Sequence, residues 1–179
     1  IARFAGYGFN KSHATAYAVI AYWTAWLKAR HPAAFFAALL NMRYGDASKM
    51  MEIGRACRAR RVKLLHPDVN MSTALFTVTR DVDGSAAVRF GLAAIRGIGG
   101  KAAESIIEER AARGPFTSAD NLARRVAQRV ITRPMLDTLV KSGACDCFEQ
   151  PRQRMALIVD DIAAAWSREG VSDLQKSFF

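Results

Sequence analysis

The sequence predicts a mainly α fold that is interrupted by one small β-hairpin. Apolar residues make up 51% of the 179 residues and charged residues 23%, which is typical of a globular protein rather than a disordered chain. Most apolar residues recur at helical spacing, and only two short runs favour strands. The chain is long enough for one large domain or two small ones.

Helices are expected over most of residues 10–61. Asn10 or Ser12 can cap the first helix, which runs to about residue 30, and Pro32 suits the first turn of the second. The second helix, residues 32–42, is apolar nearly all round, so we expect it to be buried. The third begins at Asp46 or Ser48. It ends in a basic cluster: Arg55, Arg58, Arg60 and Arg61. These cations either complement the helix dipole or contact a phosphate.

Extended chain and a hairpin are expected next. Pro67 favours an extended backbone over residues 62–70, which we interpret as a domain boundary. The β-prone runs 75–79 and 87–91 flank Asp81-Val82-Asp83-Gly84, and this pattern predicts a hairpin. Further helices are then predicted at residues 101–113, 118–126, 132–141 and 151–168.

The charge is strongly positive and unevenly distributed. Lys and Arg number 26 against 16 Asp and Glu, a net charge of +10. Residues 1–70 carry 11 basic and 3 acidic groups, residues 71–148 carry 11 and 8, and residues 149–179 carry 4 and 5. Such an excess favours a polyanionic partner, although charge alone fits a merely soluble protein equally well.

Cysteine usage and hydropathy predict a cytoplasmic protein without a metal site. The cysteines, Cys57, Cys145 and Cys147, are odd in number and lack the paired spacing of zinc ligands. No charged-then-apolar signal segment is evident, and the apolar stretch at residues 14–27 is too short to span a membrane. We therefore expect no membrane partner, and no cofactor bound by this chain.

The segment Arg96-Gly97-Ile98-Gly99-Gly100-Lys101 carries a nucleic-acid hypothesis. We expect a short helix ending at Arg96 and Ile98 as an anchor in the core. Gly97 and Gly99 permit positive φ and a close approach of the backbone to another surface. A helix that begins at Gly100 or Lys101 would offer unpaired N–H groups to a DNA phosphate. The alternative is an ordinary C-cap glycine followed by a turn.

This pattern resembles the helix-hairpin-helix family, whose members grip the backbone of double-stranded DNA without reading bases. The six residues Arg96 to Lys101 are thus the candidate DNA-binding residues. A weaker second copy is predicted at residues 130–147, where a helix ends in Ser142-Gly143-Ala144.

Beyond this motif the chain resembles the alpha subunits of bacterial DNA polymerase III, the C-family replicative polymerases. The resemblance is carried by Phe4-Ala5-Gly6-Tyr7-Gly8-Phe9-Asn10-Lys11-Ser12-His13, His31-Pro32-Ala33, Pro67-Asp68-Val69-Asn70 and Gly91-Leu92-Ala93-Ala94-Ile95-Arg96-Gly97-Ile98-Gly99. It implies that residues 1–70 are the C-terminal part of the fingers, 71–148 a clamp-binding domain with the helix-hairpin-helix motif, and 149–179 a long helix with a clamp-binding tail. The expected fold is therefore fingers helices, a small β-hairpin and a helix-hairpin-helix domain.

The resemblance also implies roles for single residues. Lys11, Ser12 and His13 would bind the incoming deoxynucleoside triphosphate, with His13 crowding the sugar where a ribonucleotide carries its 2′-hydroxyl. A second set would dock on the sliding clamp: Gln175, Phe178 and Phe179. Lys176 and Phe178 replace residues that are more often Leu in such peptides, so the clamp affinity is open.

The same resemblance implies a polymerase whose chemistry lies elsewhere in the protein. Template-directed DNA synthesis would use Mg²⁺ at carboxylates of the palm, upstream of Ile1, so we expect no catalytic residue and no activity in this chain alone. Other replicase subunits would be further partners of the nucleotidyltransferase. Two alternatives stay open: a non-catalytic helix-hairpin-helix adaptor, and the lesion-bypass relative of this polymerase.

Overall fold

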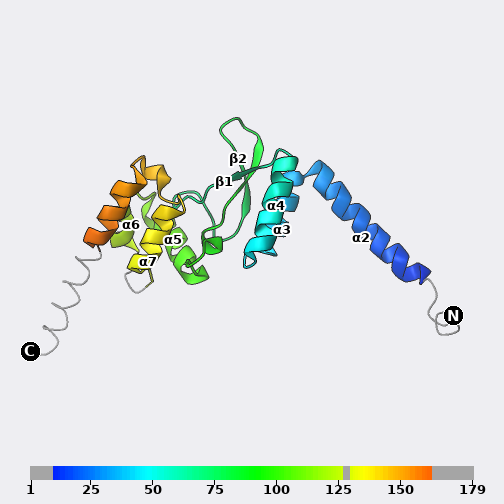
Figure 1. The fold of residues 1–179 in the computed structure, drawn as a ribbon, viewed down its shortest axis with the longest axis horizontal. Helices are drawn as coiled ribbons and strands as arrows, with labels where there is room; N and C mark the ends of the chain where they lie inside the picture. Colours follow the sequence, from blue (N-terminus) through cyan, green and yellow to red (C-terminus); the bar gives the residue numbers. More distant parts are fainter. Residues whose placement is uncertain (1–9, 127–129, 163–179) are drawn as a thin grey trace, which may run out of the picture.

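The computed structural model describes residues 10–126 and 130–162. Their elements form two lobes, and one long helix, α2 (Lys11–Arg30), extends away from both (Figure 1). The first lobe contains the sheet and two helices, and the second contains the remaining helices. The predicted fold class, mainly α with a small β element, is confirmed.

Helix α2 begins as predicted but does not pack as its sequence suggests. Asn10 Oδ1 accepts hydrogen bonds from His13 N at 3.1 Å and from the Ser12 hydroxyl at 2.8 Å, which caps the helix. Its apolar residues recur at helical spacing, yet none is buried, and the Tyr17 and Trp23 side chains are 61% and 60% exposed. The spacing identified the helix, and α3 contacts its C-terminal end, but no residue of α2 is buried by the described part of the chain.

The first lobe packs α3 (Pro32–Asn41) and α4 (Ala47–Ala59) against a three-stranded sheet. Asp46, rather than Ser48, caps α4 by accepting from Lys49 N at 3.0 Å. The buried side chains that these elements share form one core: Phe36, Leu40, Ile53, Cys57, Val62, Phe76 and Val88. The expected burial of the second helix is confirmed on one face only.

The sheet has the order β1-β3-β2 and contains one strand that was expected to be plain extended chain. The predicted hairpin is present as β2 (Thr77–Arg80) antiparallel to β3 (Ala86–Arg89). β1 (Lys63–Leu65) pairs with β3 in parallel, with Lys63 opposite Ala87. The sheet therefore joins segments on both sides of residue 70. Val62 belongs to the core of the first lobe and Val69 to the core of the second.

The second lobe contains η1 (Leu92–Ala94), α5 (Gly100–Arg113), α6 (Ala119–Arg125), α7 (Arg133–Lys141) and η2 (Asp146–Phe148). The helix predicted at residues 151–168 is present over 152–162, and its remainder lies outside the described residues. These elements share a second core: Leu92, Ile98, Ala103, Ile106, Leu122, Leu136, Leu139, Met155 and Val159.

One arginine fixes the turn between α5 and α6. The Arg125 guanidinium donates to Glu109 Oε1 at 2.9 Å and to the carbonyl oxygens of Gly114 and Pro115 at 2.6 and 3.0 Å. It also lies over the Phe116 ring, 4.4 Å from its centroid. Arg125 thereby holds the end of α5 in place, and with it the orientation of the whole helix.

Candidate nucleic-acid interface

Residues Arg96–Lys101, hereafter the glycine turn, connect η1 to α5. The preceding helix is a single 3₁₀ turn that ends at Ala94, so the prediction that it reaches Arg96 is wrong. Ile95 already has an extended backbone, with φ −72° and ψ 123°. Ile98 N donates to Ile95 O at 2.9 Å and closes the turn. A short hydrogen-bonded loop, not a long first helix, presents these residues.

The two glycines that flank Ile98 differ in conformation. Gly97 has φ +92°, a left-handed conformation that favours glycine. Gly99 has φ −78° and ψ 164°, an extended conformation open to any residue, so it does not use the positive φ that glycine permits. A Cβ atom added to Gly99 or Gly100 would meet nothing within 4 Å. Folding does not require glycine at these two positions, and the space over them is open.

Ile98 anchors the turn, as predicted. Its side chain is 3% exposed and belongs to the core formed with Ala102, Ala103 and Ile106 of α5. The other residues of the turn are exposed: Arg96, Gly97, Gly99, Gly100 and Lys101. The core therefore holds the backbone rigidly while the surrounding N–H groups and cations face solvent.

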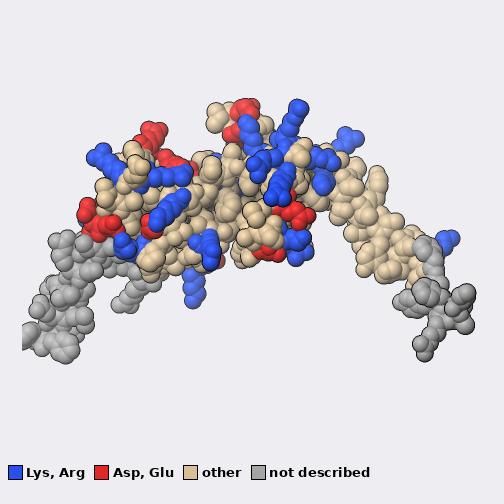
Figure 2. All heavy atoms as spheres, in the orientation of Figure 1, with Lys and Arg blue, Asp and Glu red and all other residues tan. Residues whose placement is uncertain are grey.

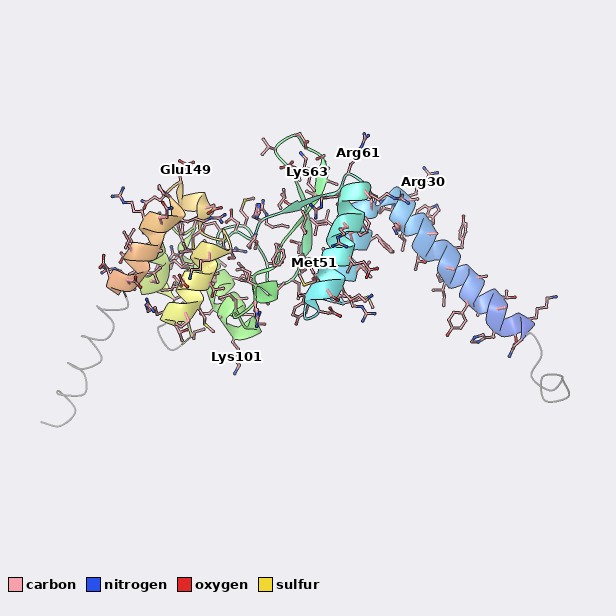
Figure 3. All side chains as sticks on the ribbon, in the orientation of Figure 1. Arg30, Met51, Arg61, Lys63, Lys101 and Glu149 are labelled. Atoms are coloured by element: carbon pink, nitrogen blue, oxygen red, sulfur yellow. The ribbon has the colours of Figure 1, made fainter. Side chains whose placement is uncertain are left out.

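The start of α5 is chemically suited to an anion. Helices α2, α4 and α6 begin with a capping side chain, from Asn10, Asp46 and Ser118. Gly99 has no side chain to cap α5, so the first N–H groups of this helix lack an acceptor among the described side chains. Lys101 projects away from the lobe (Figure 3), and neither it nor Arg96 forms an ion pair with a described residue.

Comparison with known proteins agrees with this geometry. The profile described as "Helix-hairpin-helix motif" matches residues 61–155, more than half of the chain. The chain belongs to the helix-hairpin-helix family. The glycine turn lies within the matched region, between η1 and α5.

Similarity extends over nearly the whole chain to named relatives. DNA polymerase III subunit alpha of Chlamydia trachomatis is 38% identical over 167 residues, 93% of this chain and 13% of the relative. The subunit of Thermus aquaticus is 43% identical over 145 residues, and that of Neisseria meningitidis 41% over 161 residues. The chain spans 12% to 14% of the length of these relatives. The expected resemblance to these alpha subunits is confirmed.

The predicted second hairpin around Gly143 is not an open turn. Gly143 has φ +85° and is buried, and a Cβ atom there would lie 2.5 Å from Arg152 Nη2. Ala144 N donates to Leu139 O at 3.0 Å and Gly143 N to Val140 O at 3.1 Å, a Schellman cap that ends α7. Gly143 therefore ends a helix and is not exposed as Gly99 is, and the weaker second copy of the motif at residues 130–147 stays a prediction.

The other predicted site residues lie apart from the glycine turn. Lys11, Ser12 and His13 are exposed in the first turn of α2, at the end of this helix that lies farthest from both lobes (Figure 1). The His13 ring packs 4.4 Å from the Tyr17 ring, measured between centroids. The proposed clamp-binding residues Gln175, Phe178 and Phe179 lie outside the described residues.

Four aspartates of the chain have structural roles. Asp46 caps α4, Asp68 accepts from Asn70 N at 2.7 Å within a turn, and Asp81 and Asp83 both pair with Lys63. The Lys63 ammonium lowers the pKa of both hairpin carboxyls. Over residues 10–126 and 130–162, no three His, Cys, Asp or Glu side chains gather where they could hold a metal ion. The helices of this part of the chain are also too short or too polar to cross a membrane.

The sequence did not predict that the basic cluster of α4 lies near the glycine turn. Arg55 and Arg58 border the same groove as Arg96 and Gly97, although about 40 residues separate them in the sequence. Figure 2 shows Lys and Arg side chains gathered over the end of α4. The run of arginines in the sequence was the available signal for this site. Its position next to the glycine turn depends on how α4 packs on the sheet.

Proposed function

We propose that the chain binds double-stranded DNA through its phosphate backbone at the glycine turn. The observation that carries this proposal is the open space over Gly99 and Gly100 at the uncapped start of α5. Free N–H groups and the positive end of the helix dipole attract a phosphate, and Lys101 adds a mobile positive charge. Such contacts fix the position of the duplex but do not select its sequence.

The test uses substitutions at a position where folding does not require glycine. Gly99→Val should fold normally but place a branched side chain where the phosphate approaches. We expect duplex affinity at low salt to fall by roughly tenfold, equally for unrelated sequences, with Gly99→Ala showing a smaller loss. Lys101→Gln should lower the salt slope of binding by about one, while the charge-matched control Arg30→Gln, on α2, should not. Unchanged duplex affinity in Gly99→Val would contradict the proposal.

We further propose that the chain works within the catalytic subunit of a bacterial replicative DNA polymerase, in the cytoplasm. Similarity to DNA polymerase III alpha subunits over 93% of the chain supports this, because it extends well beyond the helix-hairpin-helix motif. A stand-alone DNA-binding adaptor does not account for the similarity outside the motif. Because the carboxylates of the first lobe serve as caps and ion pairs, we expect no primer extension by the chain alone. Any extension by the purified chain would contradict this.

A nucleotide-positioning role is proposed for the start of α2. Lys11, Ser12 and His13 are exposed there, and the Tyr17 ring supports the His13 ring. In a polymerase that contains this chain, His13→Ala should raise the incorporation of ribonucleotides relative to deoxynucleotides. An unaltered sugar preference would count decisively against the role of His13.

Sliding-clamp binding is proposed for Gln175, Phe178 and Phe179 from their residue types alone. Two large apolar side chains next to a Gln suit a pocket on a partner. Replacing Phe178 and Phe179 by Ala should abolish capture of the chain by immobilised clamp, whereas Lys176→Ala should not. Retained capture would show that Phe178 and Phe179 do not bind the clamp.

A further inference from the structure

A groove of about 1060 Å³ separates α4 from the glycine turn. Apolar side chains from α4 and the sheet line much of it, among them Met50, Met51, Leu64 and Phe90. Arg55 and Arg58 of α4 face it from one side, and Arg96 and Gly97 of the glycine turn from the other. The groove is thus apolar between two basic walls, and one of these walls is the proposed DNA-binding turn.

The arginines of α4 carry charge that the described chain does not neutralise. In the second lobe, acidic side chains pair with Arg113, Arg124, Arg125, Arg133, Lys141 and Arg152. Within residues 10–126 and 130–162, Arg55, Arg58 and Arg61 form no ion pair and donate no side-chain hydrogen bond. Their positive charge is available to a polyanion.

Arg61 occupies a position that favours glycine. Arg61 N donates to Arg58 O at 3.0 Å and Val62 N to Cys57 O at 2.9 Å, so α4 ends in the same Schellman cap as α7. Gly143 takes the left-handed position in α7, but in α4 that position belongs to Arg61, with φ +56°. A cation therefore occupies a position where glycine would be less strained.

The basic wall continues from the groove to this cap. A smaller hollow beside the groove is lined by Arg58, Arg61 and Lys63, and it shares Gly54, Arg58 and Leu64 with the larger one. Arg61 projects from the end of α4 (Figure 3). The cations of α4 and the glycine turn thus border one continuous hollow surface.

We propose that this groove binds a single strand of DNA that continues from the duplex held at the glycine turn. The inference rests on the proposed function, because the glycine turn supplies the continuity. A duplex keeps its bases stacked inside, whereas a single strand can lay bases on apolar and aromatic side chains while arginines follow its phosphates. Tyr44, which lines the groove and is 43% exposed, offers a stacking surface. The unneutralised arginines favour a polyanionic strand over a peptide.

The test compares the binding of the 179-residue chain to a blunt duplex and to the same duplex with a single-stranded extension. The extension is placed at one end and then at the other. Fluorescence anisotropy at low salt should show that the extension raises the affinity of the unmodified chain by roughly tenfold. The double variant Arg55→Gln, Arg58→Gln should lose most of this gain and keep its affinity for blunt duplex. Tyr44→Ala should reduce the gain as well, while the control Arg30→Gln should retain it.

The variant Arg61→Gly should affect the stability of the chain and its DNA binding in opposite directions. Removing the left-handed arginine should raise the thermal midpoint, yet the gain from the extension should fall. The proposal is overturned if the extension adds no affinity, or if the arginine double variant keeps the gain. If the unmodified chain fails to bind blunt duplex, or Lys101→Gln leaves that binding unchanged, the failure lies with the glycine-turn proposal instead.

Discussion

The Asn70 carboxamide is paired with the backbone of Phe116, 46 residues away: its Nδ2 donates to Phe116 O at 2.8 Å, and its Oδ1 accepts from Phe116 N at 2.7 Å. Asn41 holds Phe76 in the same way, at 2.9 and 2.8 Å. Beside Asn70, Val69 N donates to Ala144 O at 2.8 Å. The segment Pro67-Asp68-Val69-Asn70, expected to be a connector, therefore ties the start of the second lobe to its α5–α6 turn and to the end of α7.

Asn70→Ala should destabilise the chain by about 2 kcal/mol, because it leaves the N–H and carbonyl of Phe116 without partners in a partly buried site. Asn70→Asp should also destabilise the fold at neutral pH, since it keeps an acceptor for Phe116 N but turns a carboxylate toward the carbonyl. Urea denaturation measures both. A free energy of unfolding unchanged in Asn70→Ala would show that this pairing does not hold the lobe.

Gly91→Ala should destabilise the fold by about 3 kcal/mol. A Cβ atom at Gly91 would lie 2.6 Å from Ala74 O and 2.7 Å from Leu75 Cα, and neither backbone atom can move without shifting the start of β2. Gly54, inside α4, is the matched control, because a Cβ there meets nothing within 4 Å. Gly54→Ala should stabilise the helix by about 0.5–1 kcal/mol. Equal effects of the two substitutions on the urea midpoint would contradict this account.

The two glycines beside Ile98 should differ in their effect on stability. Gly97→Ala forces an L-residue into φ +92° and should cost about 1–2 kcal/mol of folding free energy. Gly99→Ala, in an extended conformation with open space around it, should change stability by less than about 0.5 kcal/mol. Thermal and urea denaturation of the two variants decide the point. A strongly destabilised Gly99→Ala would mean that this glycine serves folding rather than DNA approach.

Cys147 should react slowly with alkylating agents despite its exposed position. Burial of the thiol, together with the charge of Asp68 and a hydrogen bond to it, raises the pKa of Cys147 to about 12. Because only the thiolate is nucleophilic, the rate of reaction with iodoacetamide at pH 8 should be lower than for the unfolded chain by on the order of a thousandfold. The rate should climb steadily as the pH rises toward that pKa.

The Cys147→Ser variant assigns the alkylation signal, since Cys57 and Cys145 are buried. Asp68→Asn removes one of the charges that disfavour the thiolate and should speed the reaction. A folded chain that reacts at pH 8 as fast as the unfolded one would contradict the perturbed environment of Cys147.

Much of the local structure could be predicted because it depends on residues close in the sequence. Asn10 and Asp46 cap their helices through amides three residues later, and Ile98 between two glycines signals the hairpin of the motif. The differences between the predicted and the observed structure also concern residues close together in the sequence. The spacing of apolar residues does not distinguish one 3₁₀ turn from a helix, as at Leu92–Ala94, nor does glycine's freedom mean that Gly99 uses it.

The sequence by itself determined the helical fold, the hairpin and the glycine turn, because capping, periodicity and turn chemistry act over a few residues. Only the tertiary structure decided that β1 joins the sheet in parallel, that α2 has no buried residue, and that Arg55 and Arg58 border one groove with Arg96. These arrangements depend on which apolar surfaces pack together across long stretches of chain. Which surfaces pack together depends on the complementary shapes of whole helix and sheet faces. No single segment of the sequence contains that information.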